Sequence, residues 1–580
     1  MKSLIKTGAL LMGSLLLLMP VRAQWSGEAS EPIQISEKYI WDDDWTIDAD
    51  GNVYFYYLSP DNMRIIPYVK KVNYDGTMGW NGPIRLSAYP TLTFTMVNDY
   101  VTMDREGNLV AIVWDERLDS VNRNYTATAY KIAPDGKMLW GEEGVNLCDG
   151  ESLRSGLCMK LITLEDNSTV FVYSGSLRKE DKLREGIFMQ RVSADGEVLW
   201  AGRELTVSGN YPFLVNAGNN EFYMVYCTGS KPEVYVQKYD FDGNAVWARP
   251  TLVYGEGGSG TGGAMHTVLS VGPAKDGLLV GWYDDRNETY AESVYLAYID
   301  RNGKHVFSPG DAGLKLGYSD NRQLYIQCVY NEDDDAIYAI WREMDDAQTS
   351  QQLKGQKISA AGELMWRPEG MEICWMEERQ AGQGSVQACK GGGAAFFYMT
   401  QSPYDYNHTK AYAVLYSSEG DLLWSTALLD GKHAASDLKS MPLRKNQWVV
   451  KIRDGRNYEG QGGAFDNFDI FAQNILTDGT LGSDAHLLAN EHGVNAIASF
   501  GVSPNPVRES LNVQIETGRP AALRLMLCNL VGMEVATLYE GRVEGSEMLY
   551  LTRPAGLKSG LYIVKAVLDG RESSVKVVLH

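Results

Sequence analysis

Apolar and polar residues alternate in short runs along most of the chain, which is the pattern of β-strands with one buried face. Runs such as Leu109–Trp114 and Leu278–Tyr283 are rich in β-branched and aromatic residues and are bounded by Asp, Asn or Gly. Helix formers do not dominate, whereas 59 Gly, 34 Tyr and 14 Trp are present. This combination predicts short strands joined by tight turns.

One motif recurs eight times, at intervals of 47 to 60 residues. Each copy has an alternating strand and then Asp-Gly or a close variant, and in seven of the eight an aromatic lies four residues after the glycine. The glycines are Gly76, Gly136, Gly196, Gly243, Gly303, Gly362, Gly420 and Gly479. The fourth residues after them are Trp80, Trp140, Trp200, Trp247, Phe307, Trp366, Trp424 and, in the last copy, Ser483.

The motif predicts a β-hairpin followed by a packing residue. Asp-Gly between alternating segments favours a type I′ turn, which needs positive φ at both central residues. An aromatic at a fixed offset from that turn is expected to pack against the adjacent repeat. Each repeat also has an earlier turn leading into a second β-rich run, as in Met103–Arg117. Each unit therefore reads as four antiparallel strands.

Four strands repeated radially describe the blades of a β-propeller. We therefore predict an all-β protein in which residues 24–490 form an eight-bladed propeller, with seven blades as the alternative. A β-solenoid is less favoured, because solenoid repeats are shorter. The segment Trp25–Ser36 resembles an isolated fourth strand and is expected to pair with the last blade and close the ring.

The first 23 residues have the features of a cleavable signal peptide. Lys2 and Lys6 precede an apolar run, Gly8–Met19, and small residues before Gln24 place the cleavage between Ala23 and Gln24. The apolar run is short for a membrane span, and no later segment reaches 18 apolar residues. The mature protein is therefore expected to leave the cytoplasm without a transmembrane helix.

The C-terminal residues differ in texture from the repeats. A polar linker, residues 491–500, precedes short strands in residues 501–580, which predict a small β-sandwich. The motif residues in this part are Pro504, Asn505, Pro506, Gly532, Gly560, Tyr562, Lys565 and Lys576. Their order resembles that of the type A C-terminal sorting domain of the type IX (Por) secretion system.

This resemblance implies a bacterium of the Bacteroidetes lineage and export through the periplasm to the cell surface or the extracellular space. Its implied partners are the type IX translocon and a cell-surface sortase, with attachment to lipopolysaccharide or release after sorting. The repeats resemble uncharacterised propeller repeats of exported proteins in such bacteria, in the elements Trp114–Arg117, Gln190–Trp200 and Gln237–Trp247. That second resemblance implies a fold and no activity.

Charge and cysteine content narrow the possible partners. The formal net charge of -21 repels phosphate backbones, so nucleic acid is not an expected partner. Seven cysteines are too few for a disulfide framework in so long a chain, and because the number is odd they cannot all pair. Cys148 with Cys158, and Cys374 with Cys389, occupy similar places in two repeats, so a bridge in either pair is one reading and buried free thiols are the other.

Acidic residues and arginines follow the second strand of several repeats, where the loops of neighbouring blades converge on one face. As a ligand-binding set we predict Asp115, Glu116, Arg117, Asp284, Asp285, Arg286, Arg342, Glu343, Asp454 and Arg456. Such groups around a pore suit a glycan, peptide or protein ligand, and paired carboxylates also suit glycoside hydrolysis. The alternative is that they form repeat-equivalent salt bridges that fix the loops.

Other chemistries have little support. The sequence has no zinc-binding, nucleophile-elbow or phosphate-loop motif, and its Asp-Gly copies match the sialidase Asp-box poorly. Oxygen-bearing residues at alternate positions suit calcium in Asp48/Asp50/Asn52 and Asp240/Asp242/Asn244, but tight turns also explain them. No cofactor is predicted. We expect an exported ligand-binding propeller without enzymatic activity, with an extracellular sialidase-like glycoside hydrolase or an envelope scaffold as alternatives.

Overall fold

The computed structural model describes residues 25–580, apart from residues 38–39, 62–63, 92–98, 120–123, 149–151, 180–181, 201–204, 229–232, 256–267, 286–291, 308–312, 346, 348, 375–379, 383, 403–404, 444–446, 459–466, 484–498, 517–520, 530–533, 544–545 and 569–570. The predicted cleavage residues Ala23 and Gln24 lie outside the described part. The chain divides into two compact units, Met1–Ser483 and Asp484–His580.

Antiparallel β-sheet makes up nearly all of the described regular structure, as the alternating pattern predicts. The described part also contains a three-residue 3-10 helix, η3 (Arg456–Tyr458). Within the same residues, no helix has the length and apolar character needed to cross a membrane.

The strands of the first unit follow one another as antiparallel meanders. The first three meanders contain β2 (Asp42–Ile47), β3 (Val53–Asp61), β4 (Arg64–Val72), β5 (Ile84–Arg85); β6 (Val101–Met103), β7 (Leu109–Asp119), β8 (Asn124–Ile132), β9 (Val145–Asn146); and β10 (Ser152–Thr163), β11 (Thr169–Lys179), β12 (Lys182–Val192), β13 (Leu205–Val207). The next two contain β14 (Asn210–Gly218), β15 (Glu221–Thr228), β16 (Glu233–Tyr239), β17 (Thr251–Tyr254); and β18 (Val268–Ala274), β19 (Gly277–Asp284), β20 (Ser293–Asp300), β21 (Leu314–Lys315).

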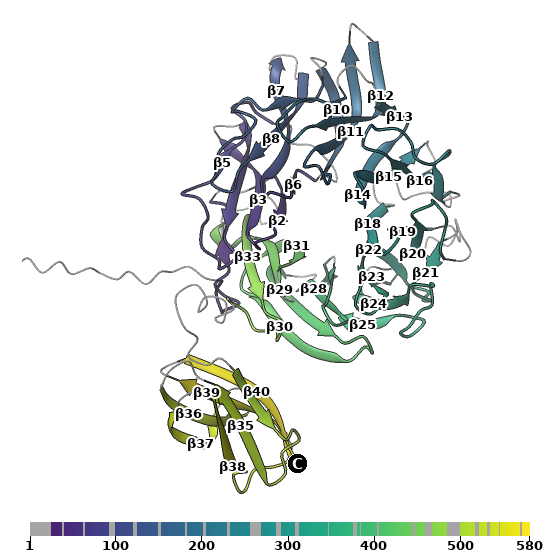
Figure 1. Cartoon of the computed structure of the whole chain (residues 1–580). Helices are drawn as coiled ribbons and strands as arrows, with labels where there is room; N and C mark the ends of the chain where they lie inside the picture. Colours follow the sequence, from purple (N-terminus) through teal and green to yellow (C-terminus); the bar gives the residue numbers. More distant parts are fainter. Residues whose placement is uncertain are drawn as a thin grey trace, which may run out of the picture. The chain divides into compact units, whose positions relative to one another are not determined.

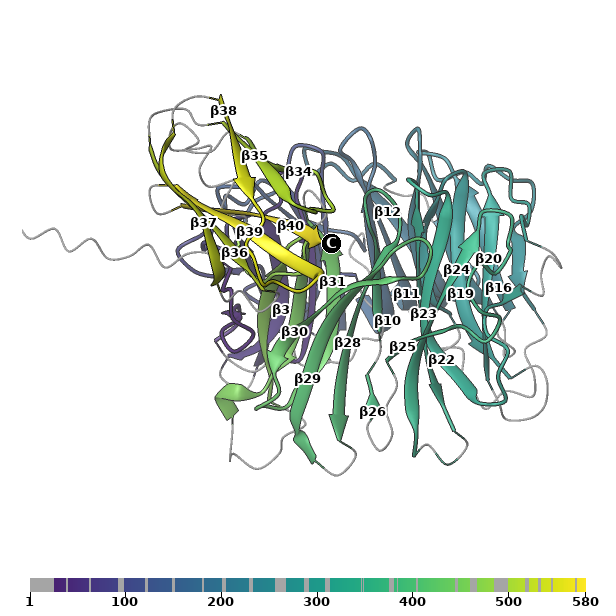
Figure 2. The ribbon, with the colours of Figure 1, turned by 90° about the horizontal axis from the view of Figure 1, so that it is seen from below.

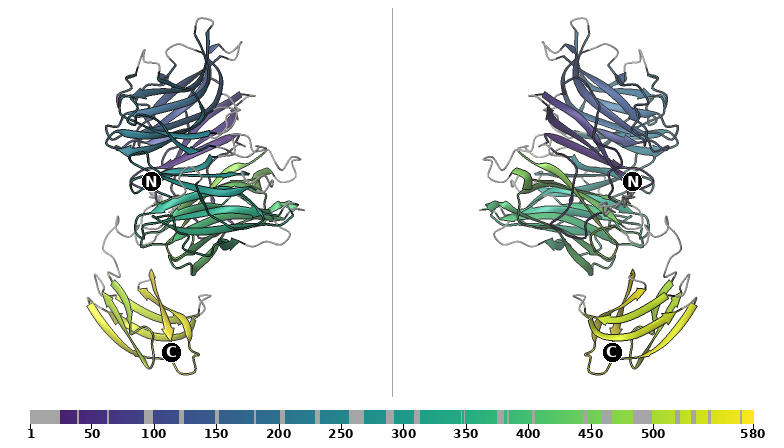
Figure 3. Two further views of the ribbon diagram at one scale, coloured as in Figure 1. Left: turned by 90° about the vertical axis from the view of Figure 1, so that its right-hand side faces the viewer. Right: turned by 90° about the vertical axis from the view of Figure 1, so that its left-hand side faces the viewer.

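The remaining meanders of this unit contain β22 (Arg322–Asn331), β23 (Ala336–Met344), β24 (Gln351–Ser359), β25 (Met371–Cys374); β26 (Gln380–Ala381), β27 (Ser385–Ala388), β28 (Ala394–Ser402), β29 (Asp405–Tyr416), β30 (Leu422–Asp430); and β31 (Ala435–Pro442), β32 (Trp448–Asp454), β33 (Asp469–Ile475) with β1 (Ile33–Gln34). Figure 1 shows these sheets in a ring, with β2, β6, β14, β18, β22 and β31 toward its centre. Figures 2 and 3 show the sheets side by side, face against face.

The ring is closed by the N-terminal segment, as the sequence predicts. β1 pairs antiparallel with β33, placing Ile33 opposite Ala472 and Gln34 opposite Phe471. It thereby supplies the fourth strand of the sheet β31–β32–β33. Because this strand comes from the start of the chain, the last and first meanders are fastened together.

The repeated Asp-Gly turn is not the predicted type I′ turn. In the first copy, the Gly76 amide donates to the Asn73 carbonyl at 2.8 Å, and the Asn73 amide donates to the Thr77 carbonyl at 2.7 Å. Gly76 has a positive φ of 89°, whereas Asp75 does not. The loop is thus a type I turn followed by a left-handed glycine, the three-residue hairpin with a bulge. The Asp75 carboxylate, which accepts from the Thr77 amide, supports this form.

The aromatic four residues after the glycine packs on the next repeat, which confirms that prediction. The Trp80 indole donates to the Pro134 carbonyl at 3.0 Å, and the Trp140 indole donates to the Ala194 carbonyl at 3.1 Å. A Cβ on Gly196 would lie 2.8 Å from the Trp140 ring. The glycine therefore provides both the left-handed conformation and room for the neighbour's ring.

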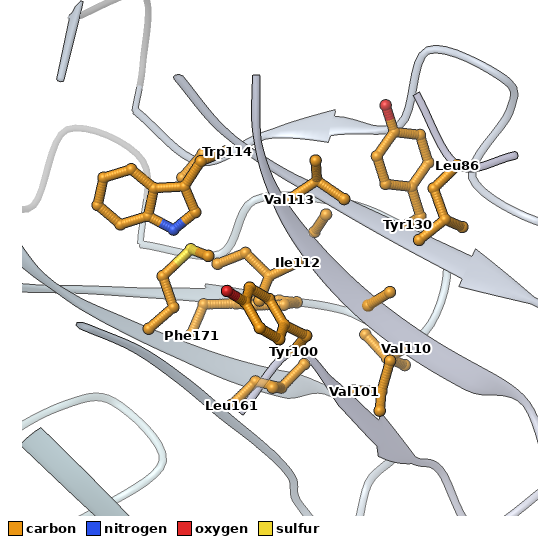
Figure 4. Packing of buried hydrophobic residues seen from close by; sticks show 14 of the residues in the cluster. Leu86, Tyr100, Val101, Val110, Ile112, Val113, Trp114, Tyr130, Leu161 and Phe171 are labelled. Carbon is orange, nitrogen blue, oxygen red and sulfur yellow. The ribbon is translucent and has the colours of Figure 1, made fainter. Parts of the chain in front are cut away.

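Buried apolar side chains fill the spaces between neighbouring sheets. Figure 4 shows one such cluster, in which Ile112 and Trp114 of β7 lie near Leu161 of β10 and Phe171 of β11. Trp114 meets Tyr173 of β11 edge to face, with ring centroids 6.3 Å apart. Burying a large apolar side chain contributes roughly 1.5–3 kcal/mol, so these clusters hold adjacent meanders together. None of the seven cysteines forms a disulfide bond, so neither considered pair is bridged.

The second unit contains two small sheets that share one buried core. The sheets are β34 (Ser499–Ser503), β35 (Ser510–Glu516), β38 (Ser546–Thr552); and β37 (Glu534–Val543), β36 (Ala521–Cys528), β39 (Gly560–Leu568), β40 (Arg571–Leu579). Val513 and Ile515 of one sheet and Leu525 and Val564 of the other are buried in this core. The unit is therefore a small β-sandwich.

Asn505, between the two motif prolines, is clipped to the last strand. Its side-chain amide donates to the Lys576 carbonyl at 3.1 Å, and its side-chain oxygen accepts from the Val578 amide at 2.8 Å. The side chain thus forms the two hydrogen bonds to the backbone of β40 that a neighbouring strand would form. Gly560 begins β39, and Tyr562 and Lys565 lie within it. Gly532 is outside the described residues.

Candidate functional site

Four of the six predicted acidic residues occupy one repeated place in their sheets. In each sheet, one residue of the second strand pairs with a residue at or next to the end of the third strand. The acid lies six residues after that paired residue. The pairs that set this register are Leu109 with Ile132, Leu278 with Ile299, Ile337 with Ile358, and Trp448 with Ile475. The acids that follow are Asp115, Asp284, Glu343 and Asp454, all of them buried. They therefore take equivalent positions on the second strand of four different meanders, β7, β19, β23 and β32.

The partners of Asp115 come from its own sheet and the segment leading into it. Ser87 donates to its carboxylate at 2.9 Å, and Arg117 forms an ion pair with it at 2.8 Å. The Arg117 guanidinium also donates to the Tyr130 hydroxyl and to the Glu143 carbonyl. Although burial opposes it, the Asp115 carboxylate raises the pKa of Arg117. This pair fixes the loop.

Asp454 and Arg456 repeat the same arrangement in the last meander. Their side chains form an ion pair at 2.8 Å, and Arg456 also donates to the Ser30 carbonyl at 2.8 Å. The Arg456 guanidinium stacks 4.6 Å from the Phe471 ring centroid. This pair therefore ties the N-terminal segment to the last sheet.

The other predicted residues do not join these pairs. The Glu343 carboxylate accepts from neutral side chains only among its described hydrogen bonds; these donors are Ser319, Asn321, Gln323 and Gln352. The Arg342 guanidinium stacks on the Tyr325 ring at 4.3 Å, and burial lowers its pKa.

Two further residues of the set are held by local contacts. Asp284 accepts from the Trp282 indole at 2.9 Å, and the Glu116 amide donates to the Pro90 carbonyl at 3.0 Å. Asp285 is half-buried, and Arg286 lies outside the described residues. Their geometry is that of loop supports, and a ligand-binding role for the set stays a prediction.

The residues considered for calcium close their own turns. Asp48 accepts from the amides of Asp50 and Asn52 and from the Asn52 side chain, at 2.8–2.9 Å. Asp240 receives the same three bonds from Asp242 and Asn244. Across the described residues, no group of three His, Cys, Asp or Glu side chains has the arrangement of a metal site. These carboxylates serve the turns.

A second group of charged side chains lies on or next to β2, β6, β10, β31 and β32, where the last meander meets the first three. We call it the inner-strand cluster. Its members are Asp42, Asp43, Asp44, Asp99, Lys160, Asp437, Lys439, Lys451 and Arg453. β2, β6 and β31, which carry or adjoin most of them, lie toward the centre of the ring (Figure 1).

One half of the cluster is buried and joins β32 to β2. The Lys451 ammonium contacts Asp43 and lies 3.0 Å from Asp437, while Arg453 pairs with Asp42 and Asp43. The side chains of Lys451 and Asp43 are fully buried. Burial and the neighbouring Arg453 guanidinium lower the pKa of Lys451. Removing one partner of such a group leaves an uncompensated buried charge. The ion pairs of this half therefore stabilise the contact between the last and the first meander.

The other half is open to solvent. The side chain of Asp99 is 54% exposed and pairs at 2.9 Å with Lys160, whose own side chain is 4% exposed. Lys439 is exposed, and Asp44 is half-buried. Although burial opposes it, the Asp99 carboxylate raises the pKa of Lys160. The accessible half therefore offers both carboxylates and an ammonium group to a ligand.

Asp44 is the unusual member of the open half. One carboxylate oxygen accepts from the amides of Tyr100 at 2.6 Å and Val101 at 3.2 Å. Burial and the nearby Asp99 carboxylate raise its pKa to about 7, although Lys439 acts in the opposite sense. A carboxyl that exchanges its proton near neutral pH is a frequent feature of functional sites.

The sequence analysis did not find this cluster. Its members come from β2, β10, β31 and β32 and from the residue before Tyr100, which are far apart in the sequence. Two signals were present: the acidic run Asp42–Asp44 at the start of a strand, and Lys451 between the apolar residues Val450 and Ile452.

No family model matches this chain, and no curated protein matches it. Several solved structures are distantly similar. A PL25 ulvan lyase bound to -[GlcA(1-4)Rha3S]- is 11% identical over 80% of this chain and 98% of its own, with a TM-score of 0.41. The polysaccharide lyase Uly1 is 10% identical over 68% and 93%, with a TM-score of 0.40. An α-L-arabinanase from Penicillium chrysogenum is 9% identical over 78% and 97%, with a TM-score of 0.29. At these TM-scores, the similarities assign no activity to this chain.

Proposed function

We propose that this protein is an exported eight-bladed β-propeller that binds an extracellular glycan at the open half of the inner-strand cluster. The blade number is supported by the meanders β2–β5, β6–β9, β10–β13, β14–β17, β18–β21, β22–β25, β26–β30 and β31–β33 with β1. Strands β6 to β13 are connected as one sheet, but only through the pair Tyr125 with Leu153, so we count them as two blades.

The observation that carries the proposal is the accessible set of opposite charges on inner strands of neighbouring meanders. Asp99 and Lys439 offer an acceptor and a donor, and half-buried Phe213 lies beside Lys160, 4.9 Å from its ammonium to the ring centroid. Sugar hydroxyls both donate and accept hydrogen bonds, so a polar wall with one apolar ring suits them. The predicted acid–arginine set is less suited, since its buried members already have partners in their own sheets.

Binding is testable with the full-length protein and soluble polysaccharides. In affinity gel electrophoresis with arabinan, xylan, pectin or carboxymethylcellulose, we expect at least one polymer to retard the protein. Lys439→Ala should weaken that retardation several-fold, whereas Lys304→Ala, an exposed lysine on a repeat turn, should not. Equal retardation of both variants, or a protein that binds only peptides, would refute the proposed site.

The export route is proposed from the C-terminal motif. Asn505 clips the Pro-Asn-Pro segment to β40, which gives a structural reason for an asparagine between the two prolines. We expect the full chain, expressed in a bacterium with a type IX system, to reach the cell surface or medium without residues 501–580. Removing residues 501–580 should leave it in the periplasm, and surface delivery of that shortened chain would contradict the proposal.

A further inference from the structure

We infer that the proposed glycan site continues along the innermost strands to Tyr211 and Tyr325, whose rings stack on further sugar units of an extended polysaccharide chain. This inference rests on the proposed function and adds the class of ligand, which is a chain of several sugars and not a single terminal sugar. Tyr211 belongs to β14 and Tyr325 to β22, two strands that lie toward the centre of the ring (Figure 1).

Three innermost strands carry the same irregularity at the same place. In β14, β22 and β31, two consecutive residues lie opposite one residue of the second strand, which is a β-bulge. The first residue of each bulge is Tyr211, Tyr325 or Asp437. Equivalent residues of radially repeated blades have equivalent places relative to the ring axis. Since Asp437 belongs to the inner-strand cluster, the two tyrosines occupy the corresponding places in blades four and six.

The backbone of all three bulge residues is strained. Their φ angles are 52° at Tyr211, 58° at Tyr325 and 48° at Asp437, in the left-handed region. This conformation costs free energy for any residue except glycine, and it is rare for a bulky side chain. Glycine would fit each bulge without that cost, yet two of the three carry a large ring. Strain of this kind is concentrated at ligand-binding and active sites, where it directs a functional side chain.

Both tyrosine rings are partly accessible and one of them is held from above. Tyr211 and Tyr325 are half-buried. The Arg342 guanidinium lies over the Tyr325 ring, 4.3 Å from its centroid, and fixes the orientation of the ring. Tyr211 stands two residues before Phe213, the ring that lies beside Lys160 in the proposed site. Arg342 therefore acts as a positioning residue, and Tyr211 extends the apolar part of the site.

Sugar chains suit such rings because a pyranose has an apolar C–H face and a rim of hydroxyls. A tyrosine ring packs on the apolar face, and its phenol both donates to and accepts from the rim. Tyr211 and Tyr325 belong to blades four and six, whereas Lys439 belongs to the last blade. A ligand that contacts all three must span several blades, which a polysaccharide chain can do and a single sugar cannot.

Substitutions that keep the bulge and remove the ring test the inference. Asparagine tolerates the left-handed region better than most residues, so we choose Tyr211→Asn and Tyr325→Asn in the full-length protein. In affinity gel electrophoresis, each should weaken retardation by the polymer that binds about 3–10-fold. Tyr211→Phe and Tyr325→Phe keep the ring and should lose less than about twofold. Tyr235→Asn, a half-buried tyrosine on the third strand β16, is the matched control and should retain the affinity.

Thermal melts separate stacking on a sugar from a structural role. Tyr211→Gly and Tyr325→Gly relieve the backbone strain, so their melting temperatures should equal or exceed those of the Asn variants. Their binding should be as weak as that of the Asn variants, because the ring is absent from both. If retardation falls only in proportion to the melting temperature, in these variants and in Tyr235→Asn alike, the tyrosines are structural and the inference is wrong.

A measurement on the unaltered protein tests the extended ligand without any risk of misfolding. Calorimetric titration with a disaccharide and with an octasaccharide of the polymer that binds should show at least about tenfold tighter binding of the octasaccharide. Equal affinities, or Asn variants that bind as well as the wild type while Lys439→Ala does not, overturn the inference and leave the proposed function standing. Absence of binding to every polymer overturns the proposed function and the inference with it.

Discussion

The indole nitrogen of Trp25 donates to the backbone carbonyl of Tyr74 at 2.9 Å. Trp80 makes the same contact with Pro134, and Trp424 with Thr477, each two residues before a turn glycine. In the last repeat, Ser483 stands where an aromatic is expected, and its hydroxyl accepts from the Trp25 amide. Trp25 therefore takes the place of the missing aromatic and completes the cycle of contacts.

Replacing Trp25 should weaken the closure of the ring. The side chain is 2% exposed, so Trp25→Ala is expected to cost about 3–5 kcal/mol. Trp25→Phe should cost less, since it keeps most of the buried ring and loses the hydrogen bond to Tyr74. Urea unfolding of the full chain measures both, and Trp25→Ala with Ser483→Trp should regain part of the loss. Equal stability of Trp25→Ala and the wild type would contradict this role.

Two glycines separate backbone conformation from packing. Gly196 and Gly141 both have positive φ, at 93° and 80°, but only Gly196 faces a neighbouring ring, that of Trp140. Gly141→Ala should therefore cost about 1 kcal/mol, from backbone strain alone. Gly196→Ala should cost about 1–3 kcal/mol more, because its Cβ would meet Trp140 at 2.8 Å. Chemical denaturation compares them, and equal losses would mean that the ring yields freely.

The Asp115–Arg117 pair should matter for stability. Asp115→Ala leaves a guanidinium with 13% exposure beside an empty position, which should cost about 3–5 kcal/mol. Glu143→Gln is the control, because Glu143 is 75% exposed and its carboxylate lies 3.8 Å from the same guanidinium. That change should cost less than about 0.5 kcal/mol. If Asp115→Ala instead abolished glycan binding while leaving the melting temperature unchanged, the predicted ligand role would be correct.

Asp44 should make stability depend on pH. Its pKa in the folded chain is about 7, above the ordinary value of 3.8, so its contribution is full below about pH 4 and is lost as pH rises through about 7. Asp44→Asn mimics the protonated acid. Its stability advantage over the wild type should therefore be larger at pH 8 than at pH 5, by on the order of 1–3 kcal/mol. Melting curves at the two pH values check this, and a larger benefit at pH 5 would reverse the assignment.

The Asn505 clip should protect the last strand. Asn505→Asp keeps the acceptor for the Val578 amide but cannot donate to the Lys576 carbonyl. The carboxylate would face that carbonyl, so the contact should weaken by about 1 kcal/mol. Hydrogen–deuterium exchange of the full chain should then show faster exchange at the Val578 amide. Unchanged exchange would mean that β39 alone holds β40.

The spacing of residues within each repeat predicted the architecture, because the residues that form the turns and pack between repeats recur at fixed positions in the sequence. The glycine, the aromatic and the isolated strand around Ile33 specified turns, packing between repeats and closure without knowledge of distant contacts. The turn type was wrong, since a bulge with positive φ at glycine alone also fits Asp-Gly.

The candidate site could not be predicted in the same way. Asp44 and Lys439 are brought together by closure of the ring, and sequence alternation does not tell which charged positions face its centre. The predicted acids, in contrast, were correctly recognised as repeat-equivalent. Their hydrogen-bond partners, such as Ser87 for Asp115, lie in the connecting segments, where no sequence pattern predicts them.

The contact between Trp25 and Ser483 spans 458 residues. A growing chain therefore makes almost the whole first unit before its earliest strand meets a partner. Until β33 is present, Ile33 and Gln34 have no strand to pair with, and the cluster around Trp25 and Ile35 lacks Ile470 and Ala472. The fold of this unit can therefore be completed only when its synthesis ends. A chain truncated before Asp469 would expose an unpaired strand near its N-terminus, which would be prone to aggregation.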